Sequence, residues 1–454
     1  MPEPHAAARR SPRSLAELEA TLAERTDYEL QEPPAGGWTL DRMRSLLAAL
    51  GHPERAFRAI HVAGTAGKGS VACALASTLD AAGLRVGWTT SPHLVSFAER
   101  VRLGARPANE ALWVEAAAPV LAAAATLAEP PTYFEIVTAI AFELFRRARV
   151  DAAVVEAGLG GRLDATNTLP APALCVLTRI ARDHTALLGE DLASIAREKA
   201  GIVKAGVPVV AAPGSPEAEA VVRAACRDRG APLSLLGHDA SLELLPPSPS
   251  AAWPPPLRTR VATPWGEHLL EAPLAQGAAD NLALVALAAH RLEEPLGRSL
   301  APYLPQACRR LRWRGRHDLV PGQPPVFVDG AHEPASLAAL VDTCRRRAGP
   351  PPTLLFALAR DKDLAAAIRL LEPLRGTLQA CPALGARGRT PVEIAARFAA
   401  AGWEASPAPS VAAGLEAARR SALRRGSYVL VTGSLRLAGA ALSLLGEDAA
   451  PAWD

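Results

Sequence analysis

The chain has 454 residues, of which 49% are hydrophobic and 21% are charged, and this composition excludes disorder over most of its length. Its 49 Lys and Arg residues nearly balance its 46 Asp and Glu residues, giving a formal net charge of +3. Because there is no large basic excess and aromatic residues make up only 4%, we expect neither nucleic acid nor a membrane as a partner.

The six cysteines are widely spaced, and the absence of any CxxC pair argues against a zinc ribbon or a redox dithiol. The N-terminal residues lack the apolar segment of a secretory signal, and no apolar stretch in the sequence is long enough to span a bilayer. We therefore expect a cytoplasmic protein with reduced thiols.

Short apolar runs alternate with longer helical patterns over the first 300 residues, an order typical of α/β proteins. The apolar runs predict buried strands at residues 57–62, 84–90, 152–156, 174–178 and 207–212. The longer patterns predict helices at residues 70–82, 116–128, 134–147 and 282–292. The Pro-rich stretch 245–257 predicts an irregular surface loop or an edge excursion of the sheet.

The alternation restarts after the basic, Pro-containing segment 296–316. Predicted strands follow at residues 326–329, 353–358 and 428–431. Predicted helices follow at residues 334–347, 363–371, 391–401 and 435–445. We therefore predict a larger domain over residues 1–298 and a smaller, doubly wound domain over residues 299–454.

The first motif that carries chemistry is Ala-Gly-Thr-Ala-Gly-Lys-Gly-Ser at residues 63–70, between the first strand and its helix. Glycines there let backbone N–H groups surround an anion, the helix start adds its dipole, and Lys68 adds a point charge. The strict Walker pattern is not met, because Val62 takes its first Gly position and Gly69 follows the lysine. The motif predicts a phosphate loop, with an ordinary Gly-rich turn as the alternative.

Two further motifs follow predicted strands, where ligands bind in open α/β sheets. Thr-Ser-Pro-His-Leu spans residues 90–94, and a Gly-rich run from Glu156 to Asn167 follows a Val-rich strand. A carboxylate at Glu156 is well placed to hold Mg²⁺ beside a nucleotide, the alternative being a solvated surface turn. A fourth segment, 178–202, contains a histidine and a lysine that would carry no meaning without the pattern around them.

Together these segments resemble folylpolyglutamate synthase and its bifunctional relative dihydrofolate synthase, within the Mur ligase superfamily. The resemblance extends over roughly residues 40–440 and is most specific in the 12-residue run from Glu156 and in Glu-Lys-Ala-Gly-Ile at residues 198–202. Shorter matches are Phe-Ala-Glu-Arg at 97–100, Thr-Tyr-Phe-Glu at 132–135, Asp-His-Thr at 183–185, Trp-Arg-Gly-Arg at 313–316, Asp-Gly-Ala-His at 329–332, Asp-Lys-Asp at 361–363 and Thr-Gly-Ser-Leu at 432–435.

The resemblance implies a fold and a reaction. The fold would be α/β, with a P-loop-type Mur ligase central domain followed by a smaller Rossmann-like C-terminal domain. The reaction would add L-glutamate to dihydropteroate, to reduced folates, or to both, through an acyl phosphate formed from ATP. Mg²⁺ would be the cofactor, and we expect a monomer.

The resemblance also implies roles for individual residues. The catalytic residues would be Lys68, Glu156, His184 and Lys199. ATP would be bound by Gly67, Lys68, Gly69, Ser70, Asn281, Arg316 and Asp329. Magnesium would be held by Ser91, Glu156, His184 and, if it is carbamylated, Lys199. Dihydropteroate would contact Thr132, Tyr133, Phe134, Glu135, Leu163, Asp164 and Ala165. The glutamate site would include His332. An unmodified Lys199, and core packing for Tyr133 and Phe134, are the alternatives.

The chain departs from the usual family pattern at several positions. Ala66 and Ala98 each stand where the family usually has Asn, and Gly277-Ala278 replaces a usual His-Gln pair. Glu333 replaces the Asn that usually follows the Asp-Gly-Ala-His motif. We expect phosphoryl transfer to be retained, and we expect Glu333 to disfavour a second carboxylate through like-charge repulsion.

Two other functions stay open at this point. One is a ligase of the same superfamily that acts on a different acid, against which the Thr-Tyr-Phe-Glu segment argues. The other is a non-catalytic nucleotide-binding regulator, which the altered motifs suggest and the complete phosphate and metal set opposes.

Overall fold

The structure is a computed structural model, and it describes residues 12–26, 39–183, 185–248, 250–382, 388–447 and 451–454. The described residues group into two compact units. Unit 1 draws on Met1–Ala72, Gly83–Ser91 and Arg100–Leu233, and unit 2 on Cys73–Ala82, Pro92–Glu99 and Ser234–Asp454. The domain boundary after residue 298 stays a prediction.

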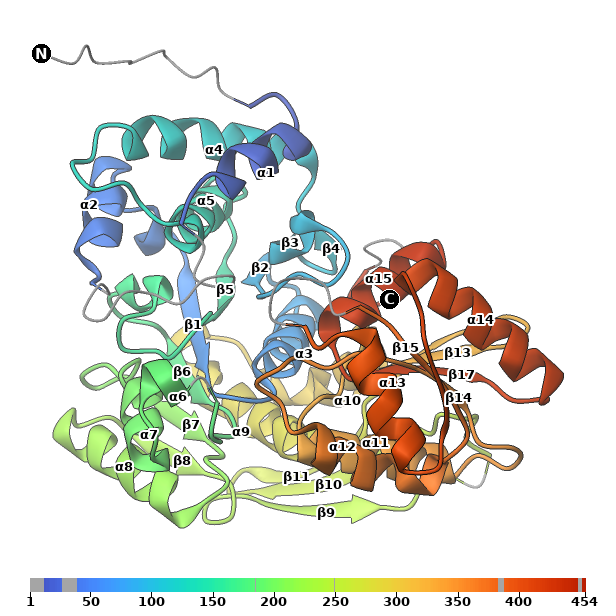
Figure 1. Ribbon diagram of the computed structural model, residues 1–454. Helices are drawn as coiled ribbons and strands as arrows, with labels where there is room; N and C mark the ends of the chain where they lie inside the picture. Colours follow the sequence, from blue (N-terminus) through green and yellow to red (C-terminus); the bar gives the residue numbers. More distant parts are fainter. Residues whose placement is uncertain (1–11, 27–38, 184, 249, 383–387, 448–450) are drawn as a thin grey trace, which may run out of the picture. The chain divides into compact units, whose positions relative to one another are not determined.

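An eight-stranded sheet forms the core of unit 1, in the order β4-β3-β2-β5-β1-β6-β7-β8 (Figure 1). Its strands are β1 (Arg58–Ala63), β2 (Val86–Thr89), β3 (Val101–Leu103), β4 (Arg106–Pro107), β5 (Ala152–Glu156), β6 (Leu174–Leu177), β7 (Val209–Ala211) and β8 (Leu233–Leu235). The strands from β2 to β7 in this order run parallel, and the five predicted strands of this region are all present. Both β5 and β6 are buried along their whole length, and apart from Glu156 at the end of β5 they are continuous apolar runs in the sequence.

The helices of this part of the chain are α1 (Leu15–Ala23), α2 (Asp41–Ala49), α3 (Lys68–Ala81), α4 (Glu110–Ala124), α5 (Tyr133–Arg147), α6 (Thr185–Leu188), α7 (Leu192–Ala200) and α8 (Pro216–Asp228). Helix α5 is buried almost throughout. It lies so close to β2 that a Cβ atom on Gly87 would come within 2.4 Å of the Phe145 ring. This glycine therefore permits the helix to lie directly on the sheet.

The long segment of unit 2, Ser234–Asp454, begins with a three-stranded antiparallel sheet of β9 (Ser241–Leu245), β10 (Leu257–Thr263) and β11 (Gly266–Ala272). The buried helix α9 (Ala279–Leu296) and α10 (Leu304–Arg309) follow. The Pro-rich stretch is the connection between β9 and β10, as predicted, but the hairpin of β10 and β11 was not predicted. Its strands pair through Thr263 and Gly266 across a turn that contains Pro264, a residue typical of turns.

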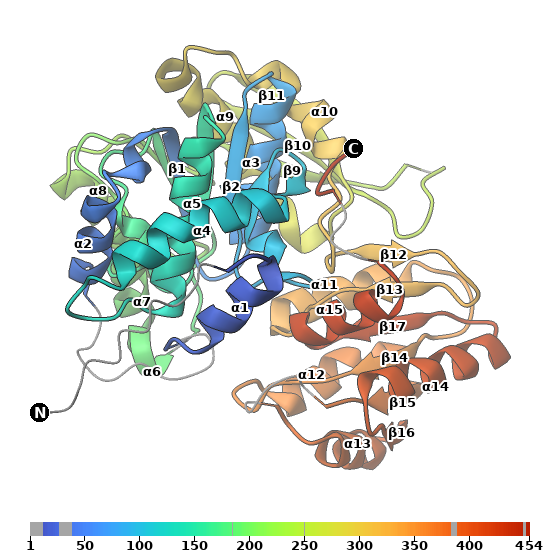
Figure 2. The same cartoon turned by 90° about the horizontal axis from the view of Figure 1, so that it is seen from above.

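A six-stranded sheet forms the second part of unit 2, and its order β12-β13-β17-β14-β15-β16 can be followed in Figure 2. The strands are β12 (Asp318–Val320), β13 (Val326–Val328), β14 (Thr353–Phe356), β15 (Thr377–Ala380), β16 (Glu404–Pro407) and β17 (Val429–Thr432). All are parallel except β12. The helices are α11 (Pro334–Arg345), α12 (Leu364–Leu371), α13 (Pro391–Ala400), α14 (Val411–Arg424) and α15 (Leu435–Leu444).

Two apolar clusters lie in this second part of unit 2. One contains buried residues of α11, α12 and α13, and the other contains buried residues of α14 and α15. This arrangement confirms the predicted α/β fold with a doubly wound C-terminal sheet. Within the described residues, no helix combines the length and apolar character that a membrane crossing needs.

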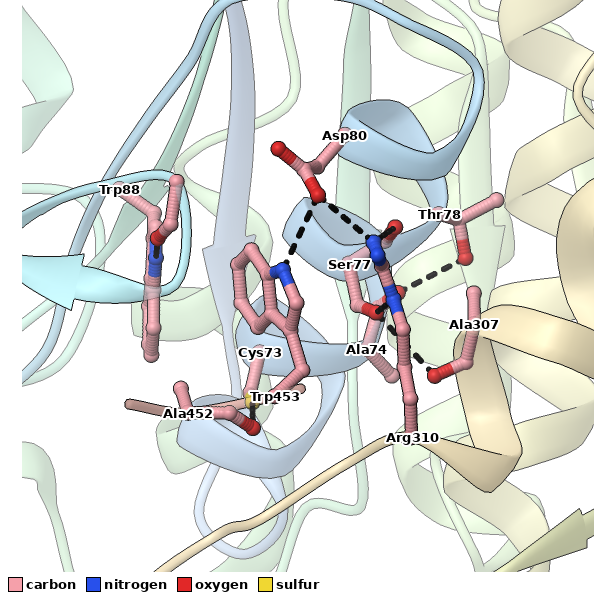
Figure 3. A network of polar contacts seen from close by, with 11 residues as sticks. Cys73, Ala74, Ser77, Thr78, Asp80, Trp88, Ala307, Arg310, Ala452 and Trp453 are labelled. Carbon is pink, nitrogen blue, oxygen red and sulfur yellow. Dashed lines mark hydrogen bonds and ion pairs between the residues drawn. The ribbon is translucent and has the colours of Figure 1, made fainter. Parts of the chain in front are cut away.

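Residues 451–454 pack against the C-terminal half of α3 and the end of α10 (Figure 3). The Trp453 indole is 2% exposed and donates a hydrogen bond to Asp80 Oδ2 at 3.0 Å. The Arg310 guanidinium donates to the same carboxylate at 2.8 Å and also to the Ser77 carbonyl. One carboxylate on α3 therefore holds two separate segments of unit 2.

Candidate functional site

The loop between β1 and α3 has a backbone that only glycine can adopt at one position. Gly64 has φ +150°, and a Cβ atom there would lie 1.9 Å from Thr178 Oγ1. The Thr65 N–H donates to the Arg179 carbonyl at 2.8 Å, and the Thr65 hydroxyl donates to the Ala181 carbonyl at 3.0 Å. The segment after β6 therefore fixes the predicted phosphate loop in place.

The predicted phosphate-binding residues lie where this loop becomes a helix. Gly67 has φ +92°, and α3 begins at Lys68 and continues through Gly69 and Ser70. The first N–H groups of an α-helix have no intrahelical acceptor, and the helix dipole makes this end attractive to anions. The four residues thus form a helix start of the kind that binds phosphate.

Two lysines meet at one carbonyl oxygen in this loop. Lys68 Nζ lies 3.2 Å from the Gly64 oxygen, and Lys199 Nζ, which comes from α7, lies 3.0 Å from the same atom. Lys199 is 3% exposed. Burial, reinforced by the charge of Lys68, lowers the pKa of Lys199 to about 7, whereas Asp183 acts in the opposite direction. Burial therefore favours the uncharged amine at Lys199.

Glu156 ends β5, the strand next to β1, and its carboxylate is 4% exposed. The Ser91 N–H donates to Glu156 Oε2 at 3.2 Å, and the Glu156 N–H donates to Thr89 Oγ1 at 3.0 Å. Burial raises the pKa of Glu156, while the charge of Lys68 and a hydrogen bond from Thr90 oppose that rise. The structure therefore brings Glu156, Ser91 and Lys68 together at one edge of the sheet.

The Gly-rich turn after β5 packs against the end of α7. A Cβ atom on Gly161 would lie 2.8 Å from the carbonyl oxygens of both Glu198 and Lys199. The Arg162 N–H donates to the Glu198 carbonyl at 2.7 Å. The two most specific sequence motifs are therefore in direct contact, and the close approach of the turn to α7 requires the glycine.

Asp164 is buried and shapes this turn from within. Its carboxylate accepts hydrogen bonds from the N–H groups of Leu159, at 2.9 Å, and Thr166, at 3.0 Å. The Thr166 hydroxyl also contacts the fully buried His61 ring at 2.8 Å. Burial raises the pKa of Asp164, and the hydrogen bonds oppose the rise. Its neighbours Leu163 and Ala165 are half-buried and buried, respectively.

The residues predicted to receive dihydropteroate form the start of α5. Thr132 and Glu135 make a capping box, in which each side chain accepts the other's backbone N–H. The Arg100 guanidinium lies over the Tyr133 ring, 5.2 Å from its centroid. The Phe134 ring lies beside Gly158, where an added Cβ would meet it at 2.6 Å.

A pocket in unit 1 opens between this helix start and the Glu156 carboxylate. It is lined by Thr89, Thr90, Ser91, Arg100, Phe134, Val137, Thr138, Ala141, Glu156 and Thr166. Phe134 therefore lines a pocket, whereas Tyr133 is 6% exposed beneath Arg100.

Two of the predicted site residues of unit 2, Asp329 and His332, follow β13. Asp329 is buried and accepts the N–H groups of His317 and Ala331, both at 2.9 Å. His332 Nδ1 lies 2.8 Å from the Gly330 oxygen. Burial lowers the pKa of His332, and the positive charges of Arg316 and Lys362 act in the same direction. Asn281 lies in the first turn of α9 and is half-buried.

His184 lies outside the described residues, so its place stays a prediction. Among the residues that the structure describes, no group of three or more His, Cys, Asp or Glu side chains could hold a metal. The donor set nevertheless fits Mg²⁺, because this ion is usually held by one or two carboxylates together with substrate phosphates and water. Glu156 is such a carboxylate, buried beside the predicted phosphate loop, and the Ser91 hydroxyl is a second oxygen donor.

Some side chains that help to form the site were not assigned a role from the sequence. Thr90 hydrogen-bonds to Glu156, Arg100 lines the pocket, and Lys362 pairs with Glu333 at 2.6 Å. Each lies in a short motif that matches the family, and this position in a motif is the only sequence feature that could have indicated a role for these side chains.

Comparison with known proteins bears on these observations. Residues 310–435 match the Mur ligase, glutamate ligase domain. The dihydrofolate synthase/folylpolyglutamate synthase of Bacillus subtilis is 37% identical over 349 residues, covering 74% of this chain and 79% of the relative. The folylpolyglutamate synthase of Lacticaseibacillus casei is 35% identical over 371 residues, covering 76% of this chain and 83% of the relative.

Solved structures give the same result over nearly the whole chain. Escherichia coli FolC in complex with DHPP and ADP superposes with a TM-score of 0.81 at 28% identity, covering 96% of this chain and 99% of that one. Mycobacterium tuberculosis folylpolyglutamate synthase complexed with ADP and AMPPCP gives a TM-score of 0.84 at 28% identity, with the same coverage.

Proposed function

Because the chain belongs to the dihydrofolate synthase/folylpolyglutamate synthase family, we propose that it is an ATP-dependent ligase that joins L-glutamate to dihydropteroate, to reduced folates, or to both. One observation carries the proposal: a phosphate loop, a buried carboxylate and two lysines meet at the ends of the neighbouring strands β1 and β5. The nucleotides in the related structures support ATP as the co-substrate.

A carboxylate is a poor electrophile, and the reaction therefore needs activation. The γ-phosphoryl group of ATP passes to a carboxylate oxygen of the substrate, and ADP leaves. The amine of L-glutamate then attacks the acyl carbon, phosphate leaves, and the new amide nitrogen loses a proton. Such transfers depend mainly on positioning and on neutralising charge.

The phosphate groups would be bound by Gly67, Lys68, Gly69 and Ser70. The anchored loop holds their N–H groups in one place before the nucleotide arrives, which reduces the entropy that binding must overcome. Lys68 adds a positive charge next to these groups. In unit 2 we assign nucleotide contacts to Asn281, Arg316 and Asp329.

Glu156 and Ser91 would hold Mg²⁺, together with His184 and a carbamylated Lys199. When bound, the ion would neutralise negative charge on the phosphate oxygens. An ammonium group cannot ligate Mg²⁺, whereas a carbamate is anionic and offers oxygen atoms. Carbamate formation requires an uncharged amine, and the pKa of about 7 at Lys199 supports this modification.

For dihydropteroate we propose the pocket beside Phe134, bordered by Thr132, Tyr133 and Glu135 and by the turn 163–165. The pocket reaches the Glu156 carboxylate, so a substrate carboxyl group at its inner end would lie beside the phosphate loop. For L-glutamate we propose the surroundings of His332, which lie within the segment that matches the glutamate ligase domain.

The decisive experiment measures phosphate release from ATP by the purified protein. Release that requires both L-glutamate and dihydropteroate, or both L-glutamate and a reduced folate, supports the proposal. Release that requires another acid would point to a different ligase, and no ATP turnover would point to a regulator. Lys68→Ala and Glu156→Ala should each reduce turnover by about 100-fold or more, since each removes a charge at the reacting phosphate. Unchanged turnover in either variant would contradict this site.

We also propose a cytoplasmic location. All six cysteines are buried and free, which is the state expected in a reducing compartment.

A further inference from the structure

Glu333 and Lys362 form an ion pair beside the start of two neighbouring helices. Glu333 is the N-cap residue of α11, and Lys362 precedes Asp363, the N-cap residue of α12. Lys362 Nζ lies 2.6 Å from Glu333 Oε1, and the two side chains are 18% and 39% exposed. The pair is therefore partly shielded from water, which strengthens it relative to a surface pair.

Both ends of this ion pair are anchored at the backbone. Arg389 donates hydrogen bonds to the carbonyls of Lys362, at 3.1 Å, and Arg360, at 3.0 Å. The Glu333 N–H donates to Ser336 Oγ at 3.2 Å, and its carbonyl accepts from Leu337 at 2.9 Å. The backbone is therefore held at both ends of the pair, and the Glu333 side chain also forms a capping box with Ser336.

The ion pair lies next to the residue assigned to the glutamate site. His332 Nε2 lies 4.0 Å from Glu333 Oε1, and the charges of Arg316 and Lys362 both act on His332. Asp361 lies 3.7 Å from Lys362 Nζ, but its side chain is 63% exposed. The structure therefore places two cationic side chains, Arg316 and Lys362, near His332, and Lys362 is already paired with Glu333.

We propose that Glu333 is a built-in competitor for the substrate's carboxylate, and that L-glutamate binds by displacing Glu333 from Lys362. The inference rests on the proposed function and adds a residue that sets the affinity for the amino acid. Exchanging one carboxylate for another on Lys362 gains little binding free energy. The apparent affinity for L-glutamate is therefore proportional to the fraction of molecules in which Lys362 is not paired with Glu333. The sequence predicts that Glu333 repels the substrate's carboxylate, whereas the structure indicates that the two carboxylates compete for Lys362.

The test measures the KM for L-glutamate in Glu333→Gln, which keeps the side-chain shape but removes the charge. We expect this KM to fall by about threefold or more, while the KM for ATP stays within about twofold. Glutarate, a dicarboxylate without an amine, should inhibit Glu333→Gln more strongly than the wild type. Lys362→Met should raise the KM for L-glutamate by about tenfold, because it removes the shared cation.

A matched control is Glu404→Gln. Glu404 lies on β16, in the six-stranded sheet of unit 2, and its carboxylate pairs with Arg425 at 3.3 Å. The KM of this variant for L-glutamate should equal that of the wild type. An unchanged or raised KM in Glu333→Gln would overturn the inference. A raised KM combined with unaltered glutarate inhibition would show instead that Glu333 binds the substrate's ammonium group. If the wild type uses no L-glutamate, it is the proposed function that fails, and the inference falls with it.

Discussion

Replacement of Gly64 by alanine tests how the phosphate loop is built. The added Cβ would lie 1.9 Å from Thr178 Oγ1, against an ordinary contact distance of 3.4 Å or more, so one partner must move by about 1.5 Å. The backbone at φ +150° adds strain of its own, since this region is essentially restricted to glycine. Overpacking costs about 1–3 kcal/mol and the strained backbone about 1–3 kcal/mol, so we expect a loss of about 3 kcal/mol in the free energy of unfolding.

Gly51→Ala separates the two contributions. Gly51 also has a positive φ, of +72°, but an added Cβ there meets no atom within 4 Å. Urea unfolding should therefore show a loss of about 1 kcal/mol for Gly51→Ala and a clearly larger loss for Gly64→Ala. The second substitution Thr178→Ala should restore part of the loss in the Gly64 variant.

The Gly64→Ala substitution should also weaken nucleotide binding. Lys68 and Lys199 both lie on the Gly64 carbonyl, so moving that oxygen displaces the two side chains together. We expect the KM for ATP to rise in Gly64→Ala and to stay unchanged in Gly51→Ala. Equal unfolding free energies for the two variants, or an unchanged KM for ATP, would refute this account of the loop.

Two further predictions follow from buried basic groups. Burial lowers the pKa of His61 to about 3, so the unfolded chain takes up a proton below about pH 6.5 while the folded chain does not. The free energy of unfolding should therefore fall by about 2 kcal/mol between pH 6.5 and pH 5 through this group, and His61→Gln should lose that part of the pH slope. The second prediction is that Lys199 carries a carbamate, which ¹³C NMR should detect as a carbamate carbon after incubation with ¹³C-bicarbonate. The signal should be lost in Lys199→Met and kept in the control Lys204→Met. A missing signal in the wild type would mean an unmodified lysine.

The sequence was informative where buried strands end in polar motifs. The runs that became β1 and β5 are mainly apolar, although β1 contains Arg58 and His61. Parallel neighbours place their carboxyl ends at one edge of a sheet, so Lys68 and Glu156 could be expected to meet. The hairpin of β10 and β11 was not predicted, because prolines precede and follow residues 257–263 and proline is typical of turns. In the structure these residues nevertheless alternate between more and less buried positions, as in a strand.

Contacts between distant segments could not be derived from the sequence. Lys199 and the Gly64 carbonyl are 135 positions apart, and no local pattern predicts that α7 directs its lysine at that oxygen. Glu333 could be identified as an unusual residue, but its partner Lys362 lies 29 positions later, at the start of another helix. The burial of Lys199 and the pairing of Glu333 with Lys362 both require the folded chain.

The hydrogen bond between Trp453 and Asp80 joins residues 373 positions apart in the chain. During translation α3 can form early, but this contact must wait until residue 453 has left the ribosome. Arg310 can reach Asp80 first and hold the carboxylate in the meantime. The helix that carries the phosphate loop would therefore be among the first segments to emerge and among the last to complete its contacts, so nascent chains stalled before residue 453 should leave it more open to proteases than released ones.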